Sequence, residues 1–572
     1  MILDKDRFKR ISPFGIIIAS CGVNLMIMHY YILCSCHMDA ILDVTSFIDN
    51  FLGISFDVIF LFFVLILITW KRIKLSLYIL FTITWLWSIF NIIYSRFFHH
   101  YLSFSAIGQG GSLFDGVVIR SISDKVYIWD LLYFFFYMLI ISIIWKINIK
   151  NTSHVKHLLV FFCFFALMDI VGHVFCCLIN PKLRYVHYFT HRIYANHIDM
   201  SLNSSQPIYA NFSRGSIRSI GLEILTDLRG NLKLDASQVE VINTMIDSSQ
   251  KMHYHLNDVK RPSNLIFILV ESLMSFTSEM KVGDNEVTPF LNSLKRDPSV
   301  YYNGKMVNNV TIGESSDGQY IYMTGLLPLR SMVTVSKAKR ASLPGLPKIL
   351  GVDSRMIIPT VSSMWNQDEM CRQYGFKDLY TSNDFEGGKY ACLTDEQVFQ
   401  LAIQKDKVSP QPFFSIILTI SMHQPYTKQI DTSFPVKESS ISMELANYLN
   451  VCHYTDRQIE KYFDYLKESG LFNNSLIVIA ADHPVNSTCF GNDNNDIPLY
   501  IVNASGLPEN MWQGKCNQLD VYTTLLDLFC NKCEWYGLGC SLVSPNYMNT
   551  VTPKTWAASE WILMSDFFSK DQ

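Results

Sequence analysis

Residues 475–483, Ser-Leu-Ile-Val-Ile-Ala-Ala-Asp-His, join an apolar run to two side chains that commonly bind metals. The same pattern occurs at Asn264-Leu-Ile-Phe-Ile-Leu-Val-Glu271 and at Phe413-Phe-Ser-Ile-Ile-Leu-Thr-Ile-Ser-Met-His423. Continuous runs rich in Ile, Leu and Val indicate buried parallel strands. Open α/β sheets bind ligands at the carboxyl ends of their strands. One polar residue at one strand end would be an ordinary terminator, but three such ends predict a shared site.

The region from residue 261 to 572 is predicted to be a single α/β domain with a doubly wound, mostly parallel sheet. Strand-like runs alternate there with amphipathic helices, as such folds require. Helices are expected at Thr288–Leu294 and Asp456–Ser469. Further short strands are expected at Met356–Thr360 and Pro498–Val502.

The first third of the chain carries most of the apolar excess. Of the 572 residues, 49% are hydrophobic and 17% are charged. Each apolar stretch is close to the ~20 residues that cross a bilayer as a helix. No small-residue cleavage site follows the first stretch, so it is expected to be an uncleaved anchor and not a signal peptide. The five predicted spans are Pro13–Cys34, Phe51–Trp70, Leu75–Tyr94, Tyr127–Trp145 and Leu158–Ile179.

Lys and Arg in the short loops predict the orientation, because positive loops stay cytoplasmic. They precede the first span, join the second to the third, and join the fourth to the fifth. The N-terminus is therefore predicted to be cytoplasmic and the C-terminal domain extracytoplasmic. The expected organisation is a five-helix membrane domain at 1–180, a connector at 181–260 and the catalytic domain. The connector should hold a helix near Ala236–Gln250 that starts at Asp235.

Cysteine content fits an oxidising compartment, whereas the net charge of −3 gives no argument for a nucleic-acid partner. An even number of cysteines outside the membrane predicts disulfides without fixing their pairing, and Cys371 with Cys392 is the preferred pair. A zinc knuckle built from the last four is the alternative. Eight of the 14 cysteines lie in the C-terminal domain, namely Cys371, Cys392, Cys452, Cys489, Cys516, Cys530, Cys533 and Cys540.

Glu271, Asp482 and His483 together form a plausible ligand set for one divalent metal ion. Two carboxylates and an imidazole suit Mn²⁺ or Zn²⁺, and suit Mg²⁺ less well because of the histidine. A catalytic site of this kind keeps a position open for a nucleophile.

Ser315 is the candidate nucleophile. It lies in Gly313-Glu-Ser-Ser-Asp317, just before an apolar helix predicted at Tyr320–Leu327. Free N–H groups at a helix start favour anions, and a metal can lower the pKa of a hydroxyl. Ser316 is the fallback nucleophile, and both serines could instead be ordinary helix caps.

Six short motifs, taken in order, resemble the lipoteichoic acid synthase family. That family belongs to the sulfatase-like part of the alkaline phosphatase superfamily, and the resemblance includes the N-terminal spans. It therefore covers essentially the whole chain and implies an alkaline phosphatase/sulfatase-like fold. The motifs are Val270-Glu-Ser272, Val287-Thr-Pro-Phe-Leu-Asn292, Gly313-Glu-Ser-Ser-Asp317, Trp365-Asn-Gln-Asp368, Ala481-Asp-His483 and Asp520-Val-Tyr-Thr-Thr-Leu-Leu526.

The resemblance implies roles for individual residues. Glu271, Asp482 and His483 match the metal ligands of the family, and Ser315 occupies the place of the threonine nucleophile, which also touches the metal. His423 matches the substrate-binding histidine. The implied enzyme moves a phosphoglycerol-type headgroup from a phospholipid donor through a phospho-serine intermediate. The implied acceptor is an envelope glycan, polymer or glycolipid, and the implied location is the bacterial cytoplasmic (inner) membrane, with the catalytic domain periplasmic or extracytoplasmic.

Trp365, Gln367 and Arg372 are predicted to contact the substrate. The chain departs from the family pattern at two positions. Ser315 replaces a threonine, which preserves the hydroxyl. Gln367 stands where the family has a phosphate-binding arginine, and a neutral amide cannot supply the charge-assisted fork of a guanidinium. Two explanations stay open: Arg372, five residues further on, compensates, or the donor headgroup or acceptor differs from that of the family.

Three rival functions remain open. A phosphoethanolamine transferase shares the anchor, the hydroxyl nucleophile and the cysteines. A true sulfatase needs a Cys/Ser-x-Pro/Ala-x-Arg context that Ser315 and Ser316 both lack. A non-catalytic envelope scaffold is the third rival.

Overall fold

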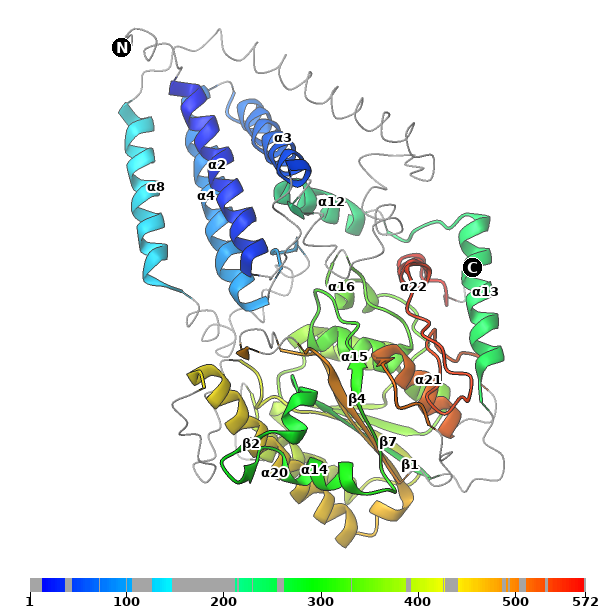
Figure 1. The fold of residues 1–572 in the computed structure, drawn as a ribbon. Helices are drawn as coiled ribbons and strands as arrows, with labels where there is room; N and C mark the ends of the chain where they lie inside the picture. Colours follow the sequence, from blue (N-terminus) through cyan, green and yellow to red (C-terminus); the bar gives the residue numbers. More distant parts are fainter. Residues whose placement is uncertain are drawn as a thin grey trace. The chain divides into compact units, whose positions relative to one another are not determined.

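A computed structural model describes most of the chain (Figure 1). Two compact units make up the protein, Met1–Ile107 with Ile119–Gly230, and Gly108–Val118 with Asn231–Gln572. The domain boundaries predicted at residues 180 and 260 stay predictions. The described residues are 13–35, 44–70, 72–98, 100–104, 126–146, 211–212, 215–228, 230–254, 262–330, 332–386, 392–424, 426, 441–485, 490–491, 494–503, 511–529 and 533–569.

Long apolar helices form the described part of the N-terminal unit, and the structure supports three of the five predicted spans. Three segments are long and apolar enough to cross a membrane, Ile17–Ser35, Ile73–Arg96 and Ile128–Lys146, and Gly53–Ile68 is a shorter apolar stretch. The predicted fifth span lies outside the described residues. The helices of this unit are α2 (Pro13–Ser35), α3 (Val44–Ile68), α4 (Ile73–Phe98), α8 (Ile128–Lys146) and α12 (Ser216–Leu228).

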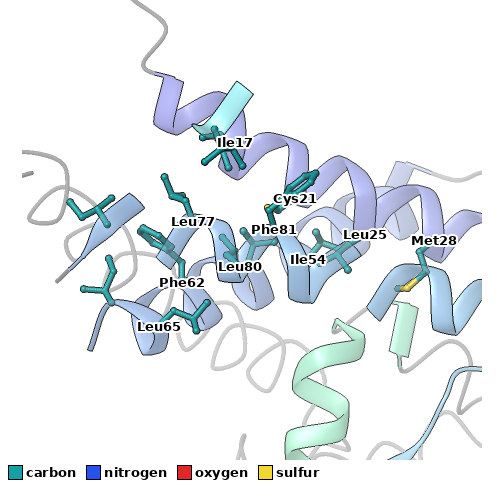
Figure 2. Packing of buried hydrophobic residues seen from close by; sticks show 14 of the residues in the cluster. Ile17, Cys21, Leu25, Met28, Ile54, Phe62, Leu65, Leu77, Leu80 and Phe81 are labelled. Carbon is teal, nitrogen blue, oxygen red and sulfur yellow. The ribbon is translucent and has the colours of Figure 1, made fainter. Parts of the chain in front are cut away.

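Helices α2, α3 and α4 pack around a shared apolar core (Figure 2). On α2, Ile17, Cys21 and Leu25 recur every four residues, so they lie on one face of the helix. Outside this core, the guanidinium of Arg96 on α4 donates to both carboxylate oxygens of Asp130 on α8, at 2.7 and 2.9 Å. Such a bidentate pair fixes two helices in orientation as well as distance.

An eight-stranded, mostly parallel sheet organises the second unit, as the sequence predicted. The strand order is β10-β4-β9-β8-β1-β7-β5-β6, and β9 runs antiparallel to both of its neighbours. The strands are β1 (Asn264–Val270), β4 (Tyr301–Val307), β5 (Asp353–Ile357), β6 (Asp378–Tyr380), β7 (Phe413–Leu418), β8 (Ser475–Ala481), β9 (Ile497–Val502) and β10 (Cys516–Asn517). A separate hairpin pairs β2 (Lys281–Val282) with β3 (Asn285–Glu286).

Helices cover both faces of this sheet. Figure 1 shows α15 and α21 against one face and α14 and α20 against the other. Every residue of β1 and β8 is buried, which explains their uninterrupted apolar sequences. The helices of this unit are α13 (Ala236–Met252), α14 (Pro289–Arg296), α15 (Ser315–Thr324), α16 (Thr334–Ala338), α17 (Leu346–Leu350), α18 (Gln367–Tyr374), α19 (Asp395–Asp406), α20 (Met443–Glu468), α21 (Gln518–Phe529) and α22 (Pro553–Ser565). Short 3₁₀ turns lie at Ser275–Glu279, Met364–Asn366, Ser382–Asp384 and Phe472–Asn474.

Most of the predicted elements are confirmed. The connector helix is α13, and Asp235 caps it by accepting the N–H of Gln238 at 2.9 Å. The predicted helix at Asp456–Ser469 is the second half of α20, which begins at Met443. The strand expected to run up to His423 ends earlier, at Leu418. The N–H of Thr419 still donates to the carbonyl oxygen of Leu269 on β1 at 3.0 Å, but the N–H groups of Ile420 and Ser421 donate to the side chain of Asp395 instead of a strand.

The preferred disulfide is wrong, although disulfide bonding itself is confirmed. Cys533 is disulfide-bonded. Cys371 is a buried free thiol on α18, and its Sγ faces the carbonyl oxygens of Phe376 and Asp378, both at 3.9 Å. A zinc knuckle from the last four cysteines is excluded, because Cys533 already forms a disulfide.

Candidate active site

Strand register brings the two predicted carboxylate ligands together. β1 and β8 are adjacent and parallel, and Val270 pairs with Ala481 at their carboxyl ends. Glu271 and Asp482 are the next residues on each strand, and His483 follows at once. All three side chains are nearly buried, and one ligand atom from each lies within 4.8 Å of the others. This convergence joins two of the three predicted strand ends, those of β1 and β8.

Hydrogen bonds hold the three ligand side chains in place. Asp482 Oδ1 accepts the N–H groups of Ser272 at 2.8 Å and His483 at 2.7 Å. Glu271 Oε1 lies 3.3 Å from His483 Nε2 and accepts the hydroxyl of Ser272 at 2.8 Å. Ser272 has a φ of 52°, a conformation that is uncommon outside glycine. This turn lets Ser272 contact both acidic groups.

Burial and the nearby charges shift the pKa of each of the three side chains. Burial raises the pKa of Asp482 to about 7, with repulsion from Glu271 adding to the effect and His483 opposing it. Burial alone would raise the pKa of Glu271, but the hydrogen bond and charge of His483, together with His423, lower it to about 2. Burial would lower the pKa of His483, yet the surrounding carboxylates raise it well above its usual value. In the metal-free protein, Glu271 and protonated His483 therefore pair, and ionisation of Asp482 is the unfavourable step.

The donor set fits a divalent cation. A cation would relieve the repulsion that raises the pKa of Asp482, and two carboxylates with one imidazole match the preferences of Mn²⁺ and Zn²⁺. His483 Nδ1 lies 2.9 Å from the carbonyl oxygen of Pro484, so that carbonyl can hold a proton on Nδ1 and leave Nε2 free to coordinate.

Ser315, the predicted nucleophile, is the first residue of α15 and lies beside this ligand group. Its Oγ is 3.2 Å from Glu271 Oε2 and 3.2 Å from His483 Nε2. The fallback, Ser316, is buried and donates its hydroxyl to the carbonyl oxygen of Gly313 at 2.7 Å. Geometry therefore favours Ser315.

Close packing of α15 against the end of β8 makes this approach possible. A Cβ at Gly318 would collide with the carbonyl oxygen of Asp482, so only glycine fits there. One turn later, Tyr322 donates its hydroxyl to the carbonyl oxygen of Ala481 at 2.8 Å. Asp317 braces the preceding loop by accepting the N–H groups of Thr311 and Gly313, at 3.0 and 2.9 Å.

His423 lies in a turn after β7, on the other side of β1 from β8. It is close enough to Glu271 for its charge to lower the pKa of that carboxyl. Asp395, the first residue of α19, holds this turn by accepting the N–H groups of Ile420 at 2.8 Å and Ser421 at 2.9 Å. Thr419 Oγ1 accepts the N–H of Glu271 at 3.0 Å, which ties the turn to the metal-ligand residue.

The other predicted substrate-binding residues, Trp365, Gln367 and Arg372, do not all lie in the same environment. Gln367 is buried and donates its amide to Gln319 Oε1 at 2.9 Å, one helical turn beyond Ser315. Trp365 precedes it in a left-handed conformation with φ of 51°. Arg372 is exposed, and at about 100° per residue it lies about 140° around α18 from Gln367. The helix therefore does not bring Arg372 to the position of Gln367, and its substrate role stays a prediction.

Sequence analysis missed four residues that shape the site. Glu314 and Ser272 are direct chain neighbours of predicted site residues, Thr419 directly follows the end of β7, and Asp395 reaches the site from α19. The signal for the first three was their adjacency to a strand end or to the serine. Asp395 could not be found in this way, because its contacts with Ile420 and Ser421 depend on the tertiary fold.

Comparisons with known proteins agree with this architecture. A family model described as Sulfatase matches residues 263–530. Lipoteichoic acid synthase 2 of Bacillus subtilis (strain 168) is 28% identical over 408 residues, 69% of this chain and 60% of that protein. Lipoteichoic acid synthase 1 of the same strain is 24% identical over 501 residues, 81% of this chain and 74% of that protein. The chain thus spans about three fifths of the length of the first of these relatives.

A solved structure resembles the fold of nearly the whole chain. It is the integral membrane protein lipooligosaccharide phosphoethanolamine transferase A from Neisseria meningitidis, at 11% identity and a TM-score of 0.53. The match covers 90% of this chain and 95% of that chain. Together with the apolar N-terminal helices, this likeness in fold identifies a membrane protein with a soluble α/β domain. Residues 263–530 belong to the sulfatase family of the alkaline phosphatase superfamily, and the chain is homologous to the lipoteichoic acid synthases at 24–28% identity.

Proposed function

We propose that the protein is a membrane-anchored, metal-dependent phosphotransferase that takes a phosphoglycerol-type headgroup from a phospholipid. The observation that carries this proposal is the position of Ser315 Oγ, 3.2 Å from both Glu271 and His483. A hydroxyl at a helix start, next to a ligand set for a divalent cation, is the arrangement expected of a phosphoryl-accepting nucleophile. Homology to lipoteichoic acid synthases supports the same reaction class.

The proposed reaction has two steps, each a substitution at phosphorus. Ser315 Oγ bonds to the headgroup phosphorus, the bond from phosphorus to the diacylglycerol oxygen breaks, and the serine proton leaves. Diacylglycerol takes up a proton and departs as an alcohol. An acceptor hydroxyl then displaces Ser315 from phosphorus, which regenerates the serine. A divalent cation bound by Glu271, Asp482 and His483 would lower the pKa of the serine hydroxyl and neutralise phosphate charge.

Substrate selection is assigned to the surroundings of His423 and Trp365. The imidazole of His423 offers a hydrogen bond to the transferred group from the side opposite β8. Gln367 supplies no positive charge and is engaged with Gln319, so donor phosphate is held mainly by the metal and the imidazole. The proposed acceptor is an envelope glycan, polymer or glycolipid. The proposed location is the bacterial cytoplasmic membrane, with the N-terminus cytoplasmic and the catalytic unit outside.

The test is the mass added to Ser315. Full-length protein in detergent would be loaded with Mn²⁺, incubated with phosphatidylglycerol or phosphatidylethanolamine vesicles, quenched in acid and analysed by peptide mass spectrometry. A glycerol phosphate adduct on Ser315 supports the proposal. An ethanolamine phosphate adduct would show instead that the protein is a phosphoethanolamine transferase. No adduct from either lipid, in protein shown to hold metal, would overturn the covalent mechanism.

A further inference from the structure

Two consecutive residues contact opposite nitrogens of one imidazole. Ser315 Oγ lies 3.2 Å from His483 Nε2, and Glu314 Oε2 lies 3.5 Å from His483 Nδ1. The ring of His483 is therefore held between the nucleophile and the acidic side chain that precedes it. Glu314 has no part in the reaction steps above and was not among the predicted site residues.

The backbone at Glu314 is strained. Its φ is 45° and its ψ is −120°, outside the regions that residues with a side chain usually adopt. Such conformations reduce stability, and they persist where the surrounding structure enforces them, often at functional sites. Here the conformation turns the Glu314 side chain towards His483 while α15 begins at Ser315. A glycine would adopt this backbone with less strain, so the carboxylate needs an explanation other than stability.

Charge explains why a carboxylate is suited to this position. For Nε2 to offer its lone pair to a metal, the ring proton must lie on Nδ1. Pro484 already provides a carbonyl acceptor for that proton at 2.9 Å. In its ionised form Glu314 adds a negative charge on the same side of the ring, which favours the proton at Nδ1 and makes Nε2 a stronger donor. Burial raises the pKa of this carboxyl to about 7, and the charge of His483 opposes that rise.

We propose that Glu314 is a positioning residue, which orients the His483 ring and strengthens Nε2 as a metal ligand at the cost of backbone strain. This inference rests on the proposed metal-dependent function. Because Glu314 and Ser315 are adjacent, one chain segment sets both the ligand and the nucleophile. The carboxylate side chain is 28% exposed, so it can be replaced without leaving a large buried void.

The test compares metal affinity with the stability of the metal-free protein. Full-length protein would be stripped with chelator, and Mn²⁺ binding measured by calorimetry for Glu314→Ala, Glu314→Gln and Glu314→Gly. We expect the Ala and Gly variants to bind Mn²⁺ about 10–100-fold more weakly, as for other partners of metal-binding histidines. The Gln variant should lie between them and the unaltered protein. Metal-free Glu314→Gly should unfold at a higher temperature than Glu314→Ala, because glycine relieves the strain.

Glu286→Ala is the matched control. Glu286 is a glutamate of similar exposure, 24%, that pairs with Arg296 at 3.1 Å. Its loss should leave Mn²⁺ affinity unchanged. Wild-type affinity in both Glu314→Ala and Glu314→Gly would overturn the role of Glu314 alone. An unaltered protein that binds no Mn²⁺ would overturn the metal-dependent function, and the role of Glu314 with it.

Discussion

The backbone N–H of Ser272 donates a 2.8 Å hydrogen bond to Oδ1 of Asp482. This bond links the residue after Glu271 to the carboxylate at the end of the neighbouring strand. The two acidic ligands are thus fixed relative to each other by the backbone, before any cation binds. Little conformational freedom is therefore lost when a metal binds. In the metal-free protein, the same arrangement holds the two acidic groups close together, where they repel each other.

Removing that repulsion should stabilise the metal-free protein while abolishing metal binding. The pKa of Asp482 is raised from its usual value to about 7, so its ionised form costs stability progressively as pH rises through that interval. At pH 8, Asp482→Asn removes this cost. If the gain is about 1 kcal/mol, Tm should rise by ~2–4 °C in chelator. Calorimetry in chelator and metal analysis after dialysis would check this, and full Mn²⁺ content in the variant would contradict the ligand assignment.

Metal affinity should rise with pH. Protons compete with a cation for Asp482, whose pKa is raised to about 7, and for His483, whose pKa is raised by the carboxylates around it. Binding must displace these protons, so the apparent affinity for Mn²⁺ should increase steadily from pH 6 to pH 8. Calorimetry at matched ionic strength would measure the trend. An affinity that is flat over this range would argue that both groups are already deprotonated in the metal-free protein.

Ser315→Ala should abolish headgroup transfer with little effect on folding. Loss of a polar side chain at a helix start costs about 1 kcal/mol. Ser315→Thr should retain part of the activity, because it keeps a hydroxyl in the same position. Ser316→Ala is the control, since its hydroxyl is engaged with the carbonyl of Gly313. Transfer assays with fluorescent lipid would rank the three, and a covalent adduct that survives in Ser315→Ala would refute the assignment.

Asp395→Ala should weaken substrate binding more than catalysis. It would leave the N–H groups of Ile420 and Ser421 without their carboxylate acceptor, at a cost of ~1–3 kcal/mol for each group that stays buried and unsatisfied. The turn that carries His423 would then be less well defined, so KM should rise while metal content is retained.

Asp406→Asn, at the other end of the same helix, is a suitable control for Asp395→Ala. Asp406 is buried and pairs with Arg355, away from the His423 turn. It should lower Tm without raising KM. Equal effects of both variants on KM would reduce Asp395 to a purely structural role.

Local sequence was sufficient to predict the central strands and the clustering of Glu271, Asp482 and His483. β1 and β8 begin and end where their apolar runs do, because both faces of each strand are buried and no alternation interrupts the pattern. β7 was predicted too long, because the apolar pattern continues past Leu418 although the N–H groups of Ile420 and Ser421 bond to Asp395 and not to a strand. The antiparallel direction of β9 was not predicted, because a short buried run does not encode the direction of its neighbours.

The direction in which individual side chains point could not be predicted from the sequence. Arg372 follows Gln367 closely in the chain, which suggested that one could replace the other. Their difference in burial emerges only once α18 is packed, with Gln367 against α15 and Arg372 in solvent. Likewise, Cys371 and Cys392 flank one loop region, but the thiol of Cys371 points towards Phe376 and Asp378.

Gly318 gives a practical criterion for recognising which homologous chains can work in the same way. Because α15 rests on the carbonyl oxygen of Asp482, any side chain at this position would lift the helix and carry the serine hydroxyl away from its neighbours. The spacing of hydroxyl residue and glycine, three apart, is thus a stricter marker of competence than the serine itself. A gene that keeps the serine, the acidic residues and the histidine but bears a larger residue at this point would encode a protein that retains the fold and has lost the reaction.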